Sequence, residues 1–237
     1  MEFFVGTSGW AYPWNEKGSL EWYVSNSRLN AVELNMSFHR FPLQSMVKSW
    51  ARKGEALRWS IKVNRLITHN FKFNDRAFQS WQKFHGLFLP LESRIDFYLF
   101  QLPPSMTPDW AEKIGDFVMK TCLDFRFALE VRNNEWFSPE WIDWASRLGI
   151  TWVSIDSTDF PLDIFNTRGL TYVRMHGRTG WYSHLYSEQE LEEVVAKVLR
   201  AKPRKVYVFF NNNHAMLTNS RGVLSLFSDL STGRPVK

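Results

Sequence analysis

Short apolar runs recur along the whole chain, and most are followed by a longer stretch whose apolar residues return every three or four positions. Alternation at period two is typical of half-buried strands, whereas the longer spacing is typical of amphipathic helices. The runs that predict strands are residues 3–5, 31–35, 57–63, 95–102, 125–132, 150–155, a stretch that begins at 170, and 205–210. The stretches that predict helices are residues 19–27, 42–53, 75–90, 107–121, one that begins at 138, 187–201 and 215–229.

The order of these elements indicates the fold class. We read it as strand followed by helix, eight times, without a long linker. Such alternation predicts a parallel sheet with helices outside it, and eight units in about 240 residues fit a compact TIM-type (β/α)8 barrel. We therefore expect a single α/β barrel domain over residues 1–237. A doubly wound open sheet is the alternative, but Gly6-Thr-Ser-Gly9 lacks the glycine spacing of a dinucleotide-binding turn.

Polar and charged residues gather at the carboxyl ends of the predicted strands. In each alternating strand they share one face, while apolar residues occupy the other. The apolar face of a barrel strand must meet the helices, so the polar face points into the barrel and its side chains converge at the C-terminal mouth, where this fold carries its active sites. The converging set is predicted to contain Glu33, Asn35, Lys62, Gln101, Glu130, Arg132, Asp156, Arg174, His176 and Asn211.

The seventh predicted strand is the most informative, because it places Arg174 and His176 on one face and Arg178 directly after Gly177. Two guanidinium groups and an imidazole at the end of a buried strand are costly unless an anionic group meets them. A satisfied internal network of ion pairs is the structural alternative. Because buried ion pairs stabilise a fold poorly compared with apolar packing, we favour a functional mouth.

Our first hypothesis is an enzyme that acts on a small anionic or phosphorylated substrate, such as a nucleotide or a sugar phosphate. The candidate catalytic residues can carry protons or charge, and they are Glu33, Glu130, His176 and Lys62. The candidate substrate-binding residues offer positive charge, amides or aromatic faces, and they are Arg132, Arg174, Arg178, Asn35, Gln101, Asn211, Trp10, Trp136, Trp181 and Tyr182. The aromatic residues fall in loops, where packing over the rim is an equally good explanation. The sequence does not choose between hydrolysis, isomerisation and elimination.

Two further hypotheses concern metal and nucleic acid. A metal-dependent, endonuclease-like phosphodiester hydrolase would need ligands for a divalent ion, and the available set is Glu33, Glu130, Asp156 and His176. The neighbouring lysine and arginines would compete for these carboxylates, so we rank an anion site above a metal site and predict no cofactor. A non-enzymatic nucleic-acid binder is compatible with the net charge of +5, but that charge is mild and its residues are scattered.

Composition limits the cellular location. The chain has one cysteine, Cys122, which rules out an internal disulfide, and 44% of its residues are hydrophobic, enough for a sizeable core. It contains no run of about eighteen apolar residues, and its first residues lack the basic and apolar regions of a signal peptide. We therefore expect a cytoplasmic protein without a membrane partner.

Several short motifs are distributed over nearly the whole chain. They are Gly6-Thr-Ser-Gly-Trp10 with Tyr12 and Trp14, Val32-Glu-Leu-Asn35 with Ser37-Phe38 and Arg40, Lys62, Thr68-His69, Phe100-Gln-Leu-Pro-Pro104, Glu130-Val-Arg132 with Trp136, Arg174-Met-His-Gly-Arg178, Trp181-Tyr182, and Phe210-Asn-Asn212 with Asn219. In this order they resemble the DUF72 family, also called the YecE-like family. The resemblance implies a TIM-type barrel similar to those of endonuclease IV and the xylose-isomerase-like enzymes. It implies no activity, because the family is named for lacking an assigned function.

Two positions depart from the family pattern. His39 stands where the family usually has tyrosine, and Asn133 stands where many members have histidine. A mechanism that relies on a tyrosine or a histidine at those places cannot be transferred to this chain. The loops after the first and sixth strands are short, so we expect a more open mouth.

Overall fold

Eight parallel strands form a closed barrel in the computed structural model, which describes residues 1–231 of the chain. Consecutive strands are neighbours throughout, and the last strand pairs with the first. The strands are β1 (Glu2–Thr7), β2 (Ala31–Leu34), β3 (Arg58–Lys62), β4 (Ile95–Gln101), β5 (Phe127–Glu130), β6 (Thr151–Ser157), β7 (Leu170–Gly177) and β8 (Lys205–Phe210). The predicted TIM-type barrel is confirmed, and residues 232–237 of the expected domain lie outside the described part.

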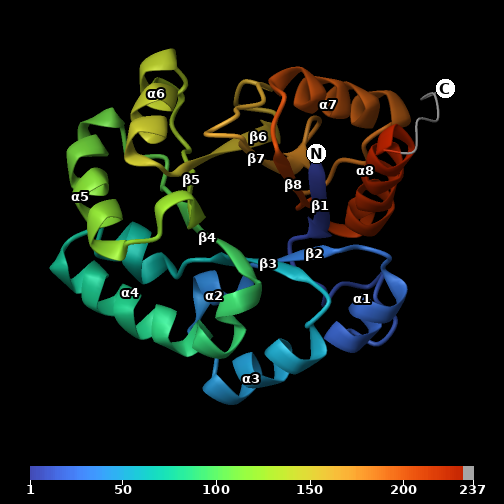
Figure 1. The fold of residues 1–237 in the computed structure, drawn as a ribbon, viewed down its shortest axis with the longest axis horizontal. Coiled ribbons are helices and arrows are strands. Elements are labelled where there is room, and N and C mark those ends of the chain that lie inside the picture. Colours follow the sequence, from blue (N-terminus) through green and yellow to red (C-terminus); the bar gives the residue numbers. More distant parts are fainter. Residues whose placement is uncertain (232–237) are drawn as a thin grey trace.

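Helices surround the barrel, and α7 and α8 lie beside the place where β8 meets β1 (Figure 1). The helices are α1 (Leu20–Asn26), α2 (Met36–His39), α3 (Gln44–Lys53), α4 (Asp75–Phe88), α5 (Ala111–Thr121), α6 (Pro139–Leu148), α7 (Glu188–Ala201) and α8 (Met216–Ser231). Local sequence rules fix where they begin: at α7 the side chains of Ser187 and Glu190 form a capping box. No helix within residues 1–231 combines the length and the apolar character needed to span a membrane.

The prediction of a helix after every strand is wrong at β6. Residues 158–169 connect β6 to β7 without a helix. Pro42 does not open α3, which begins two residues later at Gln44. The short helix α2 and a π-helical turn at Leu66–Asn70 are absent from the sequence prediction, because elements of this length show no helical periodicity.

Apolar side chains form two cores, one on each side of the barrel wall. The larger core lies between the strands and the helices and includes Val32, Ile61, Leu129 and Val173. The smaller core fills the lower part of the barrel interior and contains Ala31, Phe97, Leu99, Ala128, Val153, Tyr172, Tyr207 and Phe209. This smaller core closes the barrel interior below the mouth, and the charged side chains form the layer above it.

The first two strands approach each other unusually closely at Gly6. A Cβ atom at this position would overlap the carbonyl oxygen of Ala31 on β2, so only glycine permits the pairing. Two residues later the chain reaches Ser8, whose hydroxyl contacts Glu33 on β2. The close approach therefore carries the β1 loop to the charged centre of the mouth.

Candidate functional site

A buried arginine joins two carboxylates at the centre of the mouth. Arg174 on β7, Glu33 on β2 and Glu130 on β5 are all fully buried. The Arg174 guanidinium donates from Nε to Glu33 Oε2 (2.9 Å) and from Nη2 to Glu33 Oε1 (2.7 Å). Its Nη1 donates to Glu130 Oε2 (2.6 Å). These three residues converge as predicted, and with Arg132 they form what we call the inner network.

Both carboxylate oxygens of Glu33 accept hydrogen bonds from neighbouring side chains. Ser8 Oγ donates to its Oε1 (2.6 Å) and the Tyr172 hydroxyl donates to its Oε2 (2.6 Å), in addition to the two bonds from Arg174. A carboxylate offers about four lone-pair sites, so Glu33 has none left for a substrate proton. This geometry favours a positioning role for Glu33 over the expected acid–base role.

Glu130 is held in its ionised form. Its Oε1 accepts a hydrogen bond from Arg132 Nε (2.6 Å), and its Oε2 accepts one from Arg174. Burial raises the pKa of this carboxyl, but the charges of Arg132 and Arg174 outweigh burial and hold the pKa well below its usual range. Glu130 is therefore a weak base, and the two carboxylates of the inner network balance its two arginines.

His176 lies beside the inner network as a neutral imidazole. Burial, and next the charge of Arg174, lower its pKa well below the usual range. Its Nε2 lies 3.2 Å from Arg132 Nη2 and 3.4 Å from Arg174 Nη1, so this nitrogen accepts from the guanidinium groups. Its Nδ1 lies 3.4 Å from the side-chain amide of Asn211. The imidazole therefore contacts Asn211 at the mouth, and the two arginines oppose its protonation.

Lys62 is the cation of the mouth that lacks a carboxylate partner. It ends β3, and within residues 1–231 it forms no ion pair. Its Nζ lies 4.3 Å from the centre of the Phe38 ring. Burial, and next the charge of Arg174, lower the pKa of Lys62 to about 7. Lys62 can therefore gain or lose a proton near neutral pH.

Trp181 and Tyr182 lie on the rim, as predicted. The Trp181 ring centre lies 4.9 Å from that of His176 and 4.5 Å from Arg132 Cζ. Tyr182 is 40% exposed and stands edge-on to His176 at 5.6 Å. These rings cover one side of the inner network and leave part of their own surface open to a ligand.

Trp136 is not on the rim, so its predicted stacking position is wrong. Its ring is fully buried and packs against Trp141 and Trp152, with ring centres 5.1 Å and 6.2 Å away. Its Nε1 donates to the carbonyl oxygen of Met106 (2.8 Å). A loop tryptophan can turn inward whenever its N–H finds a buried acceptor, and the sequence carries no signal for that direction.

Asp156 and Arg178 do not join the mouth, contrary to the prediction. In the register of β6 and β7, Asp156 pairs with Met175, which belongs to the larger core between the strands and the helices. Ile155 pairs with Arg174, which faces the barrel interior. Asp156 therefore faces the helices. All seven residues of β6 are buried, and its polar Ser154 and Asp156 share the outward face, so the polar face does not mark the inward side of this strand.

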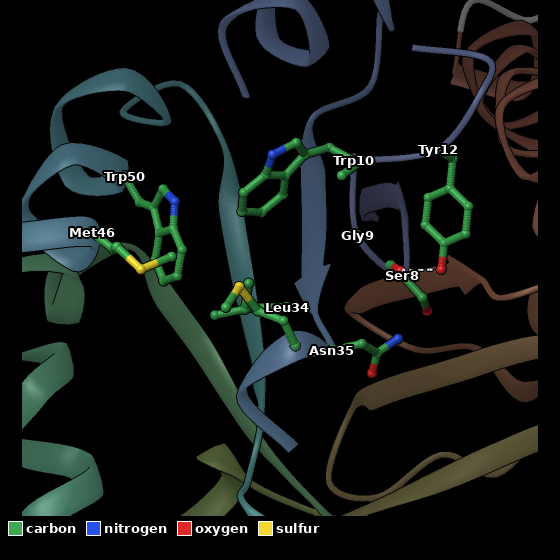
Figure 2. Close-up of a pocket in the computed structure, with 10 residues that line it drawn as sticks. Ser8, Gly9, Trp10, Tyr12, Leu34, Asn35, Met46 and Trp50 are labelled. Atoms are coloured by element: carbon green, nitrogen blue, oxygen red, sulfur yellow. Dashed lines mark hydrogen bonds between the residues drawn. The ribbon is translucent and has the colours of Figure 1, made fainter. Parts of the chain in front are cut away.

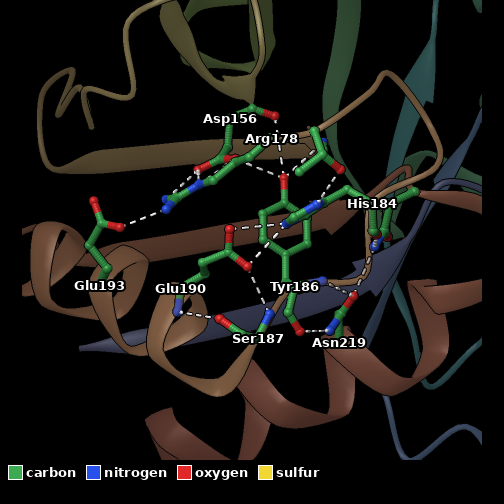
Figure 3. A network of polar contacts seen from close by, with 11 residues as sticks. Asp156, Arg178, His184, Tyr186, Ser187, Glu190, Glu193 and Asn219 are labelled. Atoms are coloured by element: carbon green, nitrogen blue, oxygen red, sulfur yellow. Dashed lines mark hydrogen bonds and ion pairs between the residues drawn. The ribbon is translucent and has the colours of Figure 1, made fainter.

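Arg178 instead joins Asp156 to helix α7 (Figure 3). It donates to both Asp156 oxygens at 2.8 to 3.1 Å and from Nη1 to Glu193 (2.6 Å). The Tyr186 hydroxyl donates to Asp156 Oδ1 (2.8 Å) and accepts from the backbone N–H of Gly177. We call Asp156, Arg178, Tyr186 and Glu193 the outer network, which holds the two ends of the loop that carries Trp181 and Tyr182.

The set proposed for a divalent ion is not brought together. Asp156 lies on the other side of the barrel wall, and the carboxylates of Glu33 and Glu130 are bonded to arginines. Within residues 1–231, no three His, Cys, Asp or Glu side chains are arranged to hold a metal ion.

The sequence prediction omitted four residues that complete the mouth. Ser8 and Tyr172 bind Glu33, and the Phe38 ring lies against Lys62. His69 stands edge-on to Phe38 (5.1 Å), and burial, followed by the charge of Lys62, lowers its pKa to about 4. Period-two spacing from Arg174 could have found Tyr172, and the family motifs contain the other three.

The remaining candidates lie around the mouth. Gln101 is half-buried at the end of β4, opposite Glu130 in the strand register. Asn35 follows β2, and its buried Oδ1 has no hydrogen-bond partner within residues 1–231. With Trp10 it lines a cavity of about 410 Å³ between the loops after β1 and β2 (Figure 2). Arg132 and Trp181 line another cavity, of about 630 Å³, on the β5 to β7 side.

The two departures from the family pattern lie outside the inner network. His39 is exposed and stands edge-on to Phe38 at 5.1 Å. Asn133 Oδ1 accepts from the backbone N–H of Glu135, and its Nδ2 donates to the carbonyl oxygen of Pro104 (3.1 Å). Asn133 therefore fixes the turn after β5 in this structure.

The closed ring of parallel strands, with its charged side chains at the carboxyl ends, defines a TIM-type α/β barrel protein. A family model described as a protein of unknown function, DUF72, matches residues 4–229. The chain therefore belongs to the DUF72 family, which confirms the resemblance seen in its motifs.

Relatives cover nearly the whole chain. The UPF0759 protein YunF of Bacillus subtilis (strain 168) is 24% identical to this chain in an alignment that covers 89% of this chain and 88% of YunF. The crystal structure of the DUF72 family protein TM1631 from Thermotoga maritima MSB8 has a TM-score of 0.85 at 24% identity and covers 96% of this chain and 100% of that one. The DUF72 family protein EF0366 from Enterococcus faecalis V583 has a TM-score of 0.78 at 19% identity, with 95% of each chain covered. These likenesses show the fold, and none of the names assigns an activity.

Proposed function

We propose that this protein is an enzyme that binds a small anionic or phosphorylated substrate at the barrel mouth and moves a proton through Lys62. The charge balance of the mouth carries the proposal. The carboxylates of Glu33 and Glu130 are met by Arg174 and Arg132, which leaves the charge of Lys62 without a counterion. An anionic group on the substrate would supply that counterion.

The chemistry follows from the pKa of Lys62, which is about 7. A group that titrates near neutral pH can act as both proton acceptor and proton donor. Binding of an anion beside Lys62 would favour its charged form and raise its pKa, so substrate binding and proton uptake are coupled. Arg174 and Glu33 position the site, while Arg132, Gln101 and Asn211 are the groups best placed to orient a substrate.

The alternatives have less support. A metal-dependent phosphodiester hydrolase would need a ligand set that the barrel does not assemble from the predicted residues. A nucleic-acid binder is supported by no specific observation beyond the mild positive charge.

The proposal places the protein in a reducing cytoplasm, which suits the exposed free thiol of Cys122.

The test is a calorimetric titration with sulfate, an anion whose charge stays constant between about pH 6 and about pH 9, so any pH dependence belongs to the protein. Repeating it in buffers of different ionisation enthalpy counts the protons taken up. We expect wild type to take up close to one proton at about pH 8, and its affinity to fall as pH rises through the pKa of Lys62.

Lys62→Met should abolish the proton uptake and weaken sulfate binding by about tenfold or more. Lys48→Met, which removes an exposed lysine from α3, is the matched control and should behave as wild type. Sulfate binding without proton uptake, or equal binding by Lys62→Met, would contradict the proposal. A substrate found by screening should lose turnover in Lys62→Met and be inhibited competitively by sulfate.

A further inference from the structure

The cavity between the β1 and β2 loops, which we call the groove, is apolar over most of its wall. Figure 2 shows Met46 and Trp50 along one side and Trp10 facing them. Trp10 stands edge-on to Trp50 and to Trp59, each at 5.8 Å between ring centres, and these contacts fix its orientation. A volume of about 410 Å³ is in the range of sites for small organic ligands.

Two of the three side-chain oxygens that line the groove already take part in hydrogen bonds within the described chain. Ser8 Oγ donates to Glu33, and the Tyr12 hydroxyl donates to the carbonyl oxygen of Ser8 (3.3 Å). The exception is Asn35, whose Oδ1 is buried and has no hydrogen-bond partner in the described chain. A buried acceptor without a donor is costly, so a donor from outside the chain, on water or on a ligand, would stabilise Asn35 Oδ1.

Helix α2 places the groove next to Lys62. Met36 lines the groove, and Phe38, two residues further on, lies 4.3 Å from Lys62 Nζ. The Ser37 hydroxyl between them donates to the carbonyl oxygen of Lys62 (2.6 Å), which ties this short helix to the end of β3. The groove and the Lys62 amine therefore lie on adjacent sides of one helical turn.

We propose that the groove binds a flat aromatic or heteroaromatic group of the substrate, which donates an N–H or O–H to Asn35 Oδ1 while its anionic group meets Lys62. This inference rests on the proposed function and narrows the substrate to an aromatic ring linked to an anion. Flat rings pack well against Trp10 and against the thioether side chains of Met36 and Met46.

A sugar is a poor occupant of the groove. Each sugar hydroxyl needs a hydrogen-bond partner when it leaves water, whereas most of the groove wall is apolar. A sugar phosphate could still place its phosphate at Lys62, but its hydroxyl groups would face Leu34, Met46 and Trp50. The chemistry of the groove thus separates the two substrate types that the sequence leaves open.

The test compares four probes by calorimetry: inorganic phosphate, ribose 5-phosphate, adenosine monophosphate, and the purine riboside monophosphate that lacks the amino group. We expect adenosine monophosphate to bind at least about tenfold tighter than ribose 5-phosphate, because only its ring fills the groove. The analogue without the amino donor should bind about three- to tenfold more weakly than adenosine monophosphate.

Three variants locate the effect. Met46→Trp fills the groove and should remove the preference for the ring while phosphate binds as in wild type. Met119→Trp makes the same change at an exposed position on α5 and should leave every affinity unchanged. Asn35→Leu should equalise the two purine ligands, because the acceptor is gone.

The outcomes separate this inference from the proposed function. Equal affinity for ribose 5-phosphate and adenosine monophosphate, with phosphate binding unchanged, would contradict ring binding in the groove. The proposed anion site at Lys62 would still stand. Adenosine monophosphate that binds equally to wild type and Lys62→Met but no longer binds to Met46→Trp would support the groove and contradict the anion site. Binding of none of these ligands would contradict both.

Discussion

The inner and outer networks are built alike, because each places one arginine between two carboxylates. Arg174 joins Glu33 to Glu130, and Arg178 joins Asp156 to Glu193. The inner arginine is fully buried at the centre of the barrel, whereas the outer one is 14% exposed and links a loop to α7. Among the described residues, the inner network adjoins a cation without a counterion, Lys62, and an amide oxygen without a donor, on Asn35. These two features mark a ligand site better than the ion pairs themselves.

The largest expected difference between the networks is in stability. Arg174→Met would leave two fully buried carboxylates without their shared cation, and we expect a loss of roughly 3–5 kcal/mol in the free energy of unfolding. Arg178→Met should cost less, roughly 1–3 kcal/mol, because Glu193 is 42% exposed and keeps its ion pair with Lys197, and the buried Asp156 keeps the hydrogen bond from Tyr186. Urea denaturation of both variants checks the comparison, and equal losses would show that burial does not separate the networks.

A smaller effect of opposite sign is expected at Lys62. Its pKa is about 7 in the folded protein, against 10.5 for a free lysine. Below pH 7 the folded state carries the full penalty of burying the charge, and between the two values only the unfolded state keeps the proton, so wild-type stability rises with pH. Lys62→Met should be more stable than wild type by about 1–3 kcal/mol at about pH 6, with little advantage near about pH 10.

Denaturation at the two pH values measures this advantage. Lys48→Met is again the matched control, because its exposed ammonium loses no hydration on folding. A Lys62→Met variant that is less stable than wild type at low pH would show that the ammonium has a stabilising partner in the folded protein. That result would contradict the conclusion that the charge of Lys62 lacks a counterion.

The smallest expected effect concerns His69. Burial, and next the charge of Lys62, lower its pKa to about 4 from 6.5, so the unfolded state takes up the proton first as pH falls. The folded protein should therefore lose stability between pH 6.5 and about 4, and His69→Asn should remove on the order of 1 kcal/mol of that loss. His176 contributes to the same loss, so part of it should remain. His214→Asn, at an exposed histidine, should change nothing in the same acid denaturation series.

Period-two alternation was sufficient to predict the barrel, the inner network and the inward position of Lys62. Glu33, Lys62, Glu130 and Arg174 lie on strands with one apolar face, so their inward direction followed from the pattern. The same rule failed at β6, where both faces are buried and Asp156 faces outward. The rule also does not predict the direction of side chains in loops. The burial of Trp136, for example, depends on an acceptor thirty residues away at Met106.

Roles were harder to predict than positions. The sequence places two glutamates in the mouth but does not show that arginines and hydroxyl groups already occupy their oxygens. It shows Asn35 as one of several amides, whereas only the structure shows that its oxygen is buried without a donor. Both properties depend on groups from strands far apart in the chain, which local spacing cannot report.

The closure of the barrel has a consequence for synthesis of the protein. β1 pairs along six residues with β8 but along only two with β2. A nascent chain emerging from the ribosome therefore cannot complete the pairing of β1 until β8 has been synthesised. Until then β1 leaves an unpaired apolar edge that chaperones can protect. Joining α8 to β1 by a linker, and opening the chain in the helix-free segment 158–169, would make β8, α8 and β1 one consecutive parallel β-α-β unit and should speed folding.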